Sequence, residues 1–102
     1  METIVKVVPN NERMTSDIIS NYELTEIIGI RTNEIEKGGP IFTDPEGLIK
    51  PELIAKKELL DKKCPLQVIR KLPNGSVEVW KCNEMAIDLT NRRLLEDNIR
   101  NV

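Results

Sequence analysis

The clearest structural signals of the sequence lie in the stretch "KPELIAKKELLDKKCPLQVIRKLPNGSVEVW", residues 50–80. It begins like a helix, because Pro51 suits the first helical position and Glu52 complements the positive end of the helix dipole. It ends like a β-hairpin, because Asn-Gly separates two runs that are rich in β-branched residues. We therefore expect a helix followed by two antiparallel strands, at about residues 51–63, 65–72 and 77–82.

A further helix is predicted on the N-terminal side of this stretch. Ser20 and Glu23 have the spacing of a capping box, in which each side chain bonds to the other residue's backbone amide. Apolar residues then recur at helical spacing, and Gly38 can end the helix in the left-handed conformation. With a helix at about residues 21–37, the sequence predicts an α+β fold of two main helices followed by a β-hairpin.

The ends of the chain give weaker patterns. Residues 3–9 are β-branched and end at a proline, which predicts an extended N-terminal arm or edge strand that pairs with another segment. Near the C-terminus, apolar residues lie among charges and are consistent with either a weak helix or a frayed end. We expect an arm at residues 1–14, a domain at 15–88 and a C-terminal extension at 89–102.

Two features of the helices suggest close contacts. Gly29 lies inside the first helix, where glycine costs about 1 kcal/mol relative to alanine, so another segment is expected to approach it unless the glycine is a tolerated accident. The helix at 51–63 is apolar on several sides, which is usual for a helix that is buried on several sides. We expect it to lie between its own domain and a partner, although a simple amphipathic helix is the alternative.

Charge is distributed unevenly along the 102 residues, whose formal net charge is −2. Summing the side chains gives −5 for residues 1–49, +4 for 50–71 and −1 for 72–102. The whole chain is therefore not drawn electrostatically to nucleic acid, but the middle is a basic island. It supports one alternative function, a stand-alone nucleic-acid-binding module that uses Lys50, Lys56, Lys57, Lys62, Lys63, Arg70 and Lys71.

No set of residues in the sequence assembles a catalytic site. Cys64 lies among lysines, which could lower the pKa of its thiol, but the chain contains no histidine to act as its base. We expect Cys64 to pack as a small apolar residue instead. Its distance in sequence from Cys82 fits no zinc motif, so the sequence predicts no catalytic residue, no cofactor and no metal. No apolar run approaches the length of a membrane span and no signal-like N-terminus occurs, so we expect neither membrane insertion nor secretion.

Several blocks of the sequence resemble one known family. These are "NYELTEIIGIR" (21–31), "KPELIAKKEL" (50–59) and "KKCPLQVIRKLPNGSVEVW" (62–80), followed by "NEM" (83–85). In this order and at this spacing they resemble the small shared subunit of multisubunit RNA polymerases. The family comprises the sixth subunit of the eukaryotic enzymes, archaeal subunit K and bacterial omega, and the resemblance covers about residues 15–88.

The resemblance implies a non-catalytic accessory subunit of DNA-directed RNA polymerase. Such a subunit clamps the C-terminal region of the largest subunit and promotes assembly and stability of the enzyme. It meets DNA only through the complex, and it binds no small-molecule substrate. Carried onto this sequence, the interface with the largest subunit would contain Tyr22, Glu23, Gly29, Arg31, Pro51, Ile54, Ala55, Lys57, Glu58, Leu59, Arg70 and Trp80.

The sequence departs from the family pattern at both ends. The long acidic N-terminal tail of the eukaryotic nuclear proteins is not in this sequence, and residues 91–102 extend beyond the usual family end. The short arm looks more like versions from large DNA viruses. We therefore expect the chain to act with the transcription machinery, in the host cytoplasm or the virion if it is viral and otherwise in the nucleus.

Overall fold

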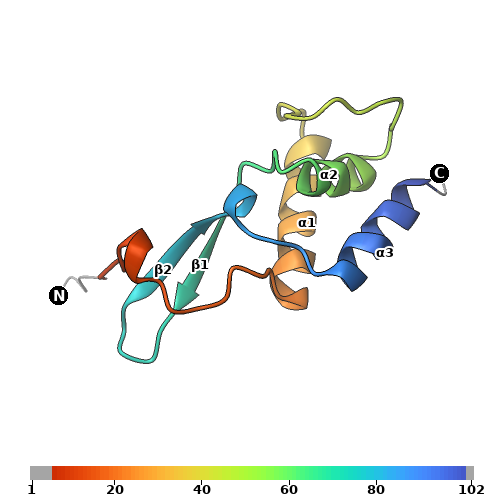
Figure 1. Ribbon diagram of the computed structural model, residues 1–102. Coiled ribbons are helices and arrows are strands. Elements are labelled where there is room, and N and C mark those ends of the chain that lie inside the picture. The colour runs from red at the N-terminus through yellow and green to blue at the C-terminus, as the bar shows by residue number, and fades with distance from the viewer. Residues whose placement is uncertain (1–5, 101–102) are drawn as a thin grey trace.

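The computed structural model describes residues 6–100 (Figure 1). They form three α-helices and one two-stranded antiparallel sheet, which confirms the α+β fold. One short 3-10 turn, Asn10–Glu12, lies near the hairpin in space, and a second, Cys82–Glu84, follows the hairpin in sequence. The elements are α1 (Asn21–Glu36), α2 (Pro51–Leu60), β1 (Gln67–Lys71), β2 (Val77–Lys81) and α3 (Leu89–Arg100).

Helix α1 begins and ends as its sequence predicts. The backbone amide of Glu23 donates to Ser20 Oγ at 3.1 Å, and the amide of Ser20 donates to Glu23 Oε1 at 3.0 Å, so the capping box is complete. At the other end Gly38 has a φ of 87°, and the amide of Gly39 reaches back to the carbonyl of Glu34 at 2.9 Å. Both ends of α1 are therefore set by local interactions.

Helix α2 ends earlier than predicted, at Leu60 rather than at residue 63. Lys62 adopts a φ of 57°, and the amide of Lys63 donates to the carbonyl of Glu58 at 2.9 Å. This is a left-handed helix end of the type that glycine normally occupies. A lysine in that conformation gives no sequence signal, and so the predicted boundary was wrong by three residues.

The hairpin is present, with Val68 opposite Trp80 and Arg70 opposite Glu78. Its tip is a three-residue loop, in which the amide of Gly75 donates to the carbonyl of Leu72 at 3.0 Å and Gly75 has a φ of 86°. Pro-Asn-Gly suits this loop, because proline favours the second position of the turn and glycine accepts the left-handed conformation.

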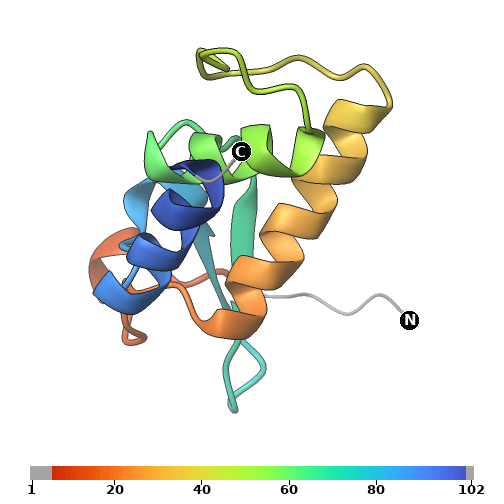
Figure 2. The same ribbon diagram turned by 90° about the vertical axis from the view of Figure 1, so that its right-hand side faces the viewer.

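Helix α2 packs against both α1 and α3 (Figures 1 and 2). Leu53, Ile54, Ala55 and Leu59 are all buried within the chain. These side chains are therefore buried without a partner, because α2 packs on both α1 and α3, and the expectation that α2 lies between its own domain and a partner stays a prediction. Leu95 is the residue of α3 that enters the core.

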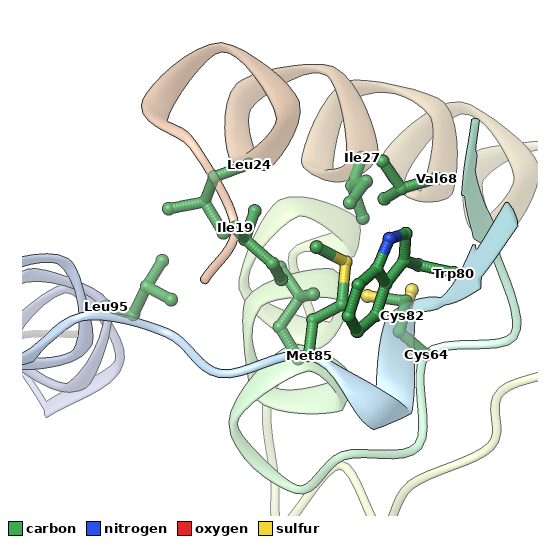
Figure 3. Close-up of a cluster of buried hydrophobic side chains, with 10 residues drawn as sticks. Ile19, Leu24, Ile27, Cys64, Val68, Trp80, Cys82, Met85 and Leu95 are labelled. Atoms are coloured by element: carbon green, nitrogen blue, oxygen red, sulfur yellow. The ribbon is translucent and has the colours of Figure 1, made fainter. Parts of the chain in front are cut away.

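The core lies where α1, α2 and the inner face of the hairpin meet (Figure 3). Trp80 supplies its largest ring, and Met85 and Ile27 pack beside it. Cys64 is buried in the same cluster, which confirms the packing role predicted for it. With a single tryptophan among few aromatic residues, this core depends on aliphatic and sulfur-containing side chains.

The described part of the N-terminal arm pairs with the chain's own hairpin. The amide of Val8 donates to the carbonyl of Val77 at 2.8 Å, and the amide of Val77 donates to the carbonyl of Lys6 at 2.9 Å. The first five residues of the predicted arm and the last two of the predicted extension lie outside the described residues. Within residues 6–100, no helix has both the length and the apolar character needed to cross a membrane.

Candidate partner interface

A buried ion pair joins α1 to α2. Arg31 Nε donates to Glu58 Oε1 and Arg31 Nη2 donates to Glu58 Oε2, each at 2.8 Å. The arginine side chain is 2% exposed and the glutamate side chain is 0% exposed. The hydrogen bonds to Glu58, followed by its charge, raise the pKa of Arg31 above the ordinary arginine value. The pair is thus fixed inside the fold, with both of its hydrogen bonds oriented by neighbouring helices.

The same pair holds the loop between the two helices. Arg31 Nη2 also donates to the carbonyl of Pro40 at 3.1 Å, and the amide of Phe42 donates to Glu58 Oε2 at 2.9 Å. The guanidinium carbon of Arg31 lies 5.5 Å from the centre of the Phe42 ring. These contacts give the buried charges further partners, which is the condition under which such pairs are tolerated.

A second arginine joins β1 to the start of α1. Arg70 Nε and Nη2 each donate to the carboxylate of Glu23 at 2.9 Å, and Nη2 also donates to the carbonyl of Ile18 at 3.0 Å. The hydrogen bonds from Arg70 lower the pKa of Glu23 to about 2, with a further contribution from the amide of Ser20. One carboxylate therefore caps α1 and anchors the hairpin.

Glu78 on β2 captures the segment that leads into α1. The backbone amide of Met14 donates to Glu78 Oε2 at 2.8 Å, the hydroxyl of Thr15 donates to Oε1, and Trp80 Nε1 donates to the same oxygen at 3.0 Å. The bond from the Thr15 hydroxyl, followed by that from the Met14 amide, lowers the pKa of Glu78 to about 2. Arg13 completes the arrangement, since its guanidinium carbon lies 4.1 Å from the Trp80 ring centre.

Between α1 and β1 the surface carries a groove of about 640 Å³. Its walls bear three exposed apolar side chains: Tyr22 is 76% exposed, Ile69 62% and Ile30 47%. Arg70 and Glu23 form part of the lining, so the ion pair between them fixes the two walls relative to each other.

The groove runs beside a strand edge. Among residues 6–100, β1 has β2 as its sheet neighbour on one side only. Ladder hydrogen bonds run from the amide of Cys82 to the carbonyl of Leu66 and from the amide of Leu72 to the carbonyl of Ser76. They show that the backbone N–H and C=O groups of the even-numbered residues of this strand point toward β2. By the alternation of an antiparallel ladder, the backbone groups of residues 67, 69 and 71 face outward, as those of an edge strand do.

The structure separates the twelve predicted interface residues by burial. Six lie inside the chain, where they build its core and its ion pair: Arg31, Ile54, Ala55, Glu58, Leu59 and Trp80. Four are half-buried: Glu23, Pro51, Lys57 and Arg70. Two are exposed, Tyr22 and Gly29. Tyr22, Glu23 and Arg70 come together at the groove, whereas Gly29 and Pro51 lie away from it.

Gly29 faces open space. A Cβ atom built on it would meet nothing within 4 Å, apart from its own helix. The expected close approach is therefore not made by α2 or by the hairpin. A shallow depression lined by Thr25, Gly29 and Glu52 lies at this point of the surface.

The basic island is largely engaged by the chain itself. Lys56 pairs with Glu52 at 3.1 Å, Lys57 with Asp61 at 2.8 Å, and Arg70 with Glu23. Lys62 Nζ donates to the carbonyl of Met85 at 2.8 Å. A surface built to bind phosphates would present these cations to solvent, so this arrangement weakens the nucleic-acid alternative.

Sequence reasoning missed the residues that hold the arm, Arg13, Thr15 and Glu78. Glu78 carried the one available signal, an acidic residue that shares a strand face with Trp80. A buried carboxylate on an otherwise apolar face requires donors, but the sequence does not show that they come from residues more than sixty positions away.

No family model matches the chain, but several curated proteins do. It is 42% identical over 84 residues to DNA-directed RNA polymerases I, II, and III subunit RPABC2 of Saccharomyces cerevisiae, a match that covers 82% of this chain and 54% of that protein. Identity to the Schizosaccharomyces pombe protein of the same name is 41% over 80 residues, or 78% and 56% of the two chains. The probable Caenorhabditis elegans protein is 35% identical over 82 residues, or 80% and 60%.

The chain thus spans a little over half the length of the curated relatives it matches. The matched regions cover about four fifths of this chain's residues. They confirm the resemblance that the sequence blocks indicate, and the chain is a homologue of the small shared subunit of DNA-directed RNA polymerases.

Proposed function

We propose that this chain is a non-catalytic accessory subunit of a multisubunit DNA-directed RNA polymerase. The observation that carries the proposal is its similarity to relatives named as subunits shared by polymerases I, II and III. In this role the chain performs no chemistry itself. It acts with the transcription machinery, and the remaining subunits of the enzyme are its partners.

We assign the groove between α1 and β1 as the contact with the largest subunit. An extended segment from the C-terminal region of that subunit would lie along the edge of β1, bond to its outward backbone groups and pack on Tyr22, Ile30 and Ile69. Tyrosine is among the residues that contribute most to interfaces, because its large ring loses little conformational entropy on binding.

The two ion pairs support this role by fixing the shape of the groove before binding. Arg70 and Glu23 hold β1 against α1, and Arg31 and Glu58 hold α1 against α2. A preformed surface lowers the free-energy cost of ordering the complex, since only the partner's segment must become ordered. The buried members of the predicted interface would then act by positioning α1 and α2 rather than by touching the partner.

Affinity purification tests the proposal directly. The tagged full-length chain, expressed in the cells in which it occurs, should recover the largest polymerase subunit together with the other subunits, as identified by mass spectrometry. Recovery of other proteins without polymerase subunits would overturn the proposed function.

Two matched substitutions test the groove. Ile69→Asp should reduce recovery of the largest subunit, because it places a charge on an apolar wall. Ile49→Asp is the control, since Ile49 is 87% exposed on the loop between α1 and α2 and is not part of the groove lining. Equal recovery by both variants, with melting temperatures like that of the parent chain, would refute the groove as the contact while leaving the polymerase assignment intact.

The source and the compartment stay hypotheses. We propose that the chain acts in the host cytoplasm or the virion if it is viral, and in the nucleus otherwise. Fractionation of the cells that produce it, with the largest polymerase subunit followed as a marker, distinguishes these compartments.

A further inference from the structure

The only two cysteines of the chain meet in the core. Cys64 follows α2 and Cys82 follows β2, so they stand at the two ends of the hairpin in sequence. Their residues are 2% and 4% exposed, and both thiols are free. Figure 3 shows the two sulfur atoms next to each other beside the Trp80 ring.

The backbone around the thiols is fixed. The amide of Cys82 donates to the carbonyl of Leu66 at 2.9 Å, which extends the hairpin ladder toward Cys64. The amide of Lys63 is bound to the last turn of α2. The segments on which the cysteines lie are thus held together by hydrogen bonds, and the two sulfur atoms lie next to each other (Figure 3).

We propose that Cys64 and Cys82 form a redox pair, which closes an intramolecular disulfide when the protein meets a peroxide. The oxidant is a peroxide, because a molecule of this size is small enough to reach buried thiols. The disulfide would enclose residues 65–81, the whole hairpin, and tie its open end to the end of α2.

The reaction proceeds in two balanced steps. The Cys64 thiolate attacks one oxygen of hydrogen peroxide, the O–O bond breaks, and the departing hydroxide takes up the thiol proton to give water and a sulfenic acid. The Cys82 sulfur then attacks the Cys64 sulfur, the S–O bond breaks, and the leaving hydroxide takes the Cys82 proton as a second water. Two thiols lose two electrons, and one peroxide is reduced to two waters.

The order of attack follows from how the thiols interact. The hydrogen bond from Cys82 lowers the pKa of Cys64, because it stabilises the Cys64 thiolate. The same bond, together with burial, raises the pKa of Cys82. We therefore take Cys64 as the nucleophile toward peroxide and Cys82 as the resolving thiol, an order that the Cys82→Ser variant below tests.

Intact mass spectrometry of the purified full-length chain tests the pair. The chain is treated with hydrogen peroxide, quenched, unfolded and alkylated. We expect a monomer that has lost two hydrogens and carries no alkyl groups, a non-reduced peptide that links Cys64 to Cys82, and recovery of two alkylatable thiols after dithiothreitol. A higher melting temperature of the oxidised chain is also expected, since the cross-link restricts the unfolded hairpin.

Several outcomes would overturn the proposal. One is that both thiols of the chain stay reduced, and are therefore alkylated, at a peroxide dose that oxidises a reference dithiol peptide. Others are oxygen addition without loss of the hydrogens, or a disulfide that joins two chains. The variant Cys82→Ser serves as the control, because it should accumulate sulfenic acid at Cys64 that a dimedone probe traps. Since the main readout uses the unmodified chain, a variant that fails to fold does not affect the result.

Discussion

Arg31 and Glu58 form two hydrogen bonds of 2.8 Å in an interior where neither side chain is more than 2% exposed. The arginine belongs to α1 and the glutamate to α2, so one contact fixes the packing of the two helices. The carbonyl of Pro40 and the amide of Phe42 bind the same two side chains, which attaches the intervening loop. A change at either residue therefore affects three parts of the fold together.

Arg31→Ala should destabilise the free chain by about 3–5 kcal/mol, because it leaves the Glu58 carboxylate buried without its partner. Urea unfolding measures the loss. Arg92→Ala is the control, since Arg92 pairs with Glu96 at 3.3 Å on an exposed face of α3 and such pairs contribute about 0–1 kcal/mol. The double replacement Arg31→Met with Glu58→Leu should recover part of the stability. A loss no larger than that of the control would contradict the structural role given to the pair.

Stability should fall as the pH is lowered from about 5 toward 2. Glu23 and Glu78 both have a pKa of about 2 in the folded chain, below the ordinary value of 4.5. Each carboxylate therefore stabilises the fold above its unfolded pKa, and this contribution is lost as the pH falls through the folded pKa. Thermal melting across this pH range measures the effect.

Glu23→Gln and Glu78→Gln should each make the acid profile shallower and lower the stability at neutral pH. Glu36→Gln serves as the control, since Glu36 is exposed at the end of α1. Parent-like acid profiles in both test variants would show that these carboxylates do not anchor the arm and the hairpin.

Gly29→Ala should stabilise the free chain by about 0.5–1 kcal/mol, because alanine is the better helix former and its Cβ meets nothing within 4 Å. Gly39→Ala gives the opposite expectation, since its Cβ would lie 2.8 Å from the backbone oxygen of Glu34. Chemical denaturation compares the two variants. Destabilisation by Gly29→Ala would mean that this face of α1 is not open in the free chain.

Gly29→Leu extends the test to the assembled enzyme. If another subunit packs closely on this face, leucine should reduce recovery of the polymerase by the tagged chain while the melting temperature stays at or above the parent value. Full recovery with higher stability would show that Gly29 does not belong to the interface and would remove it from the predicted set.

The Lys62→Gly variant should unfold with a free energy about 1 kcal/mol or somewhat more above that of Lys62→Ala. The reason is that the φ of 57° at this position is strained for any residue with a Cβ. The comparison of Lys62→Gly with Lys62→Ala is matched, since both variants lose the bond from Nζ to the carbonyl of Met85. Equal unfolding free energies would argue against the left-handed end of α2.

The elements were predictable wherever a local signal specified them. Ser20 and Glu23 mark the start of α1, Gly38 marks its end, Pro51 marks the start of α2, and Gly75 marks the hairpin tip. Each of these signals acts within a few residues of the chain, so a short segment contains everything that sets the boundary of its element. The end of α2 was predicted too late, because Lys62 adopts a conformation that its side chain does not favour.

The fold class, the order of the elements and the resemblance to the shared polymerase subunit could all be predicted from the sequence, because these depend on short-range periodicity, caps and ordered blocks. The packing of the folded chain shows that α3 forms and buries Leu95 against the rest of the core. It also shows that Arg70 meets Glu23 across 47 positions and that Glu78 binds Thr15 across 63. Such pairings arise only when packing brings distant segments together, where exclusion of water makes each unpaired charge costly and each fixed partner necessary.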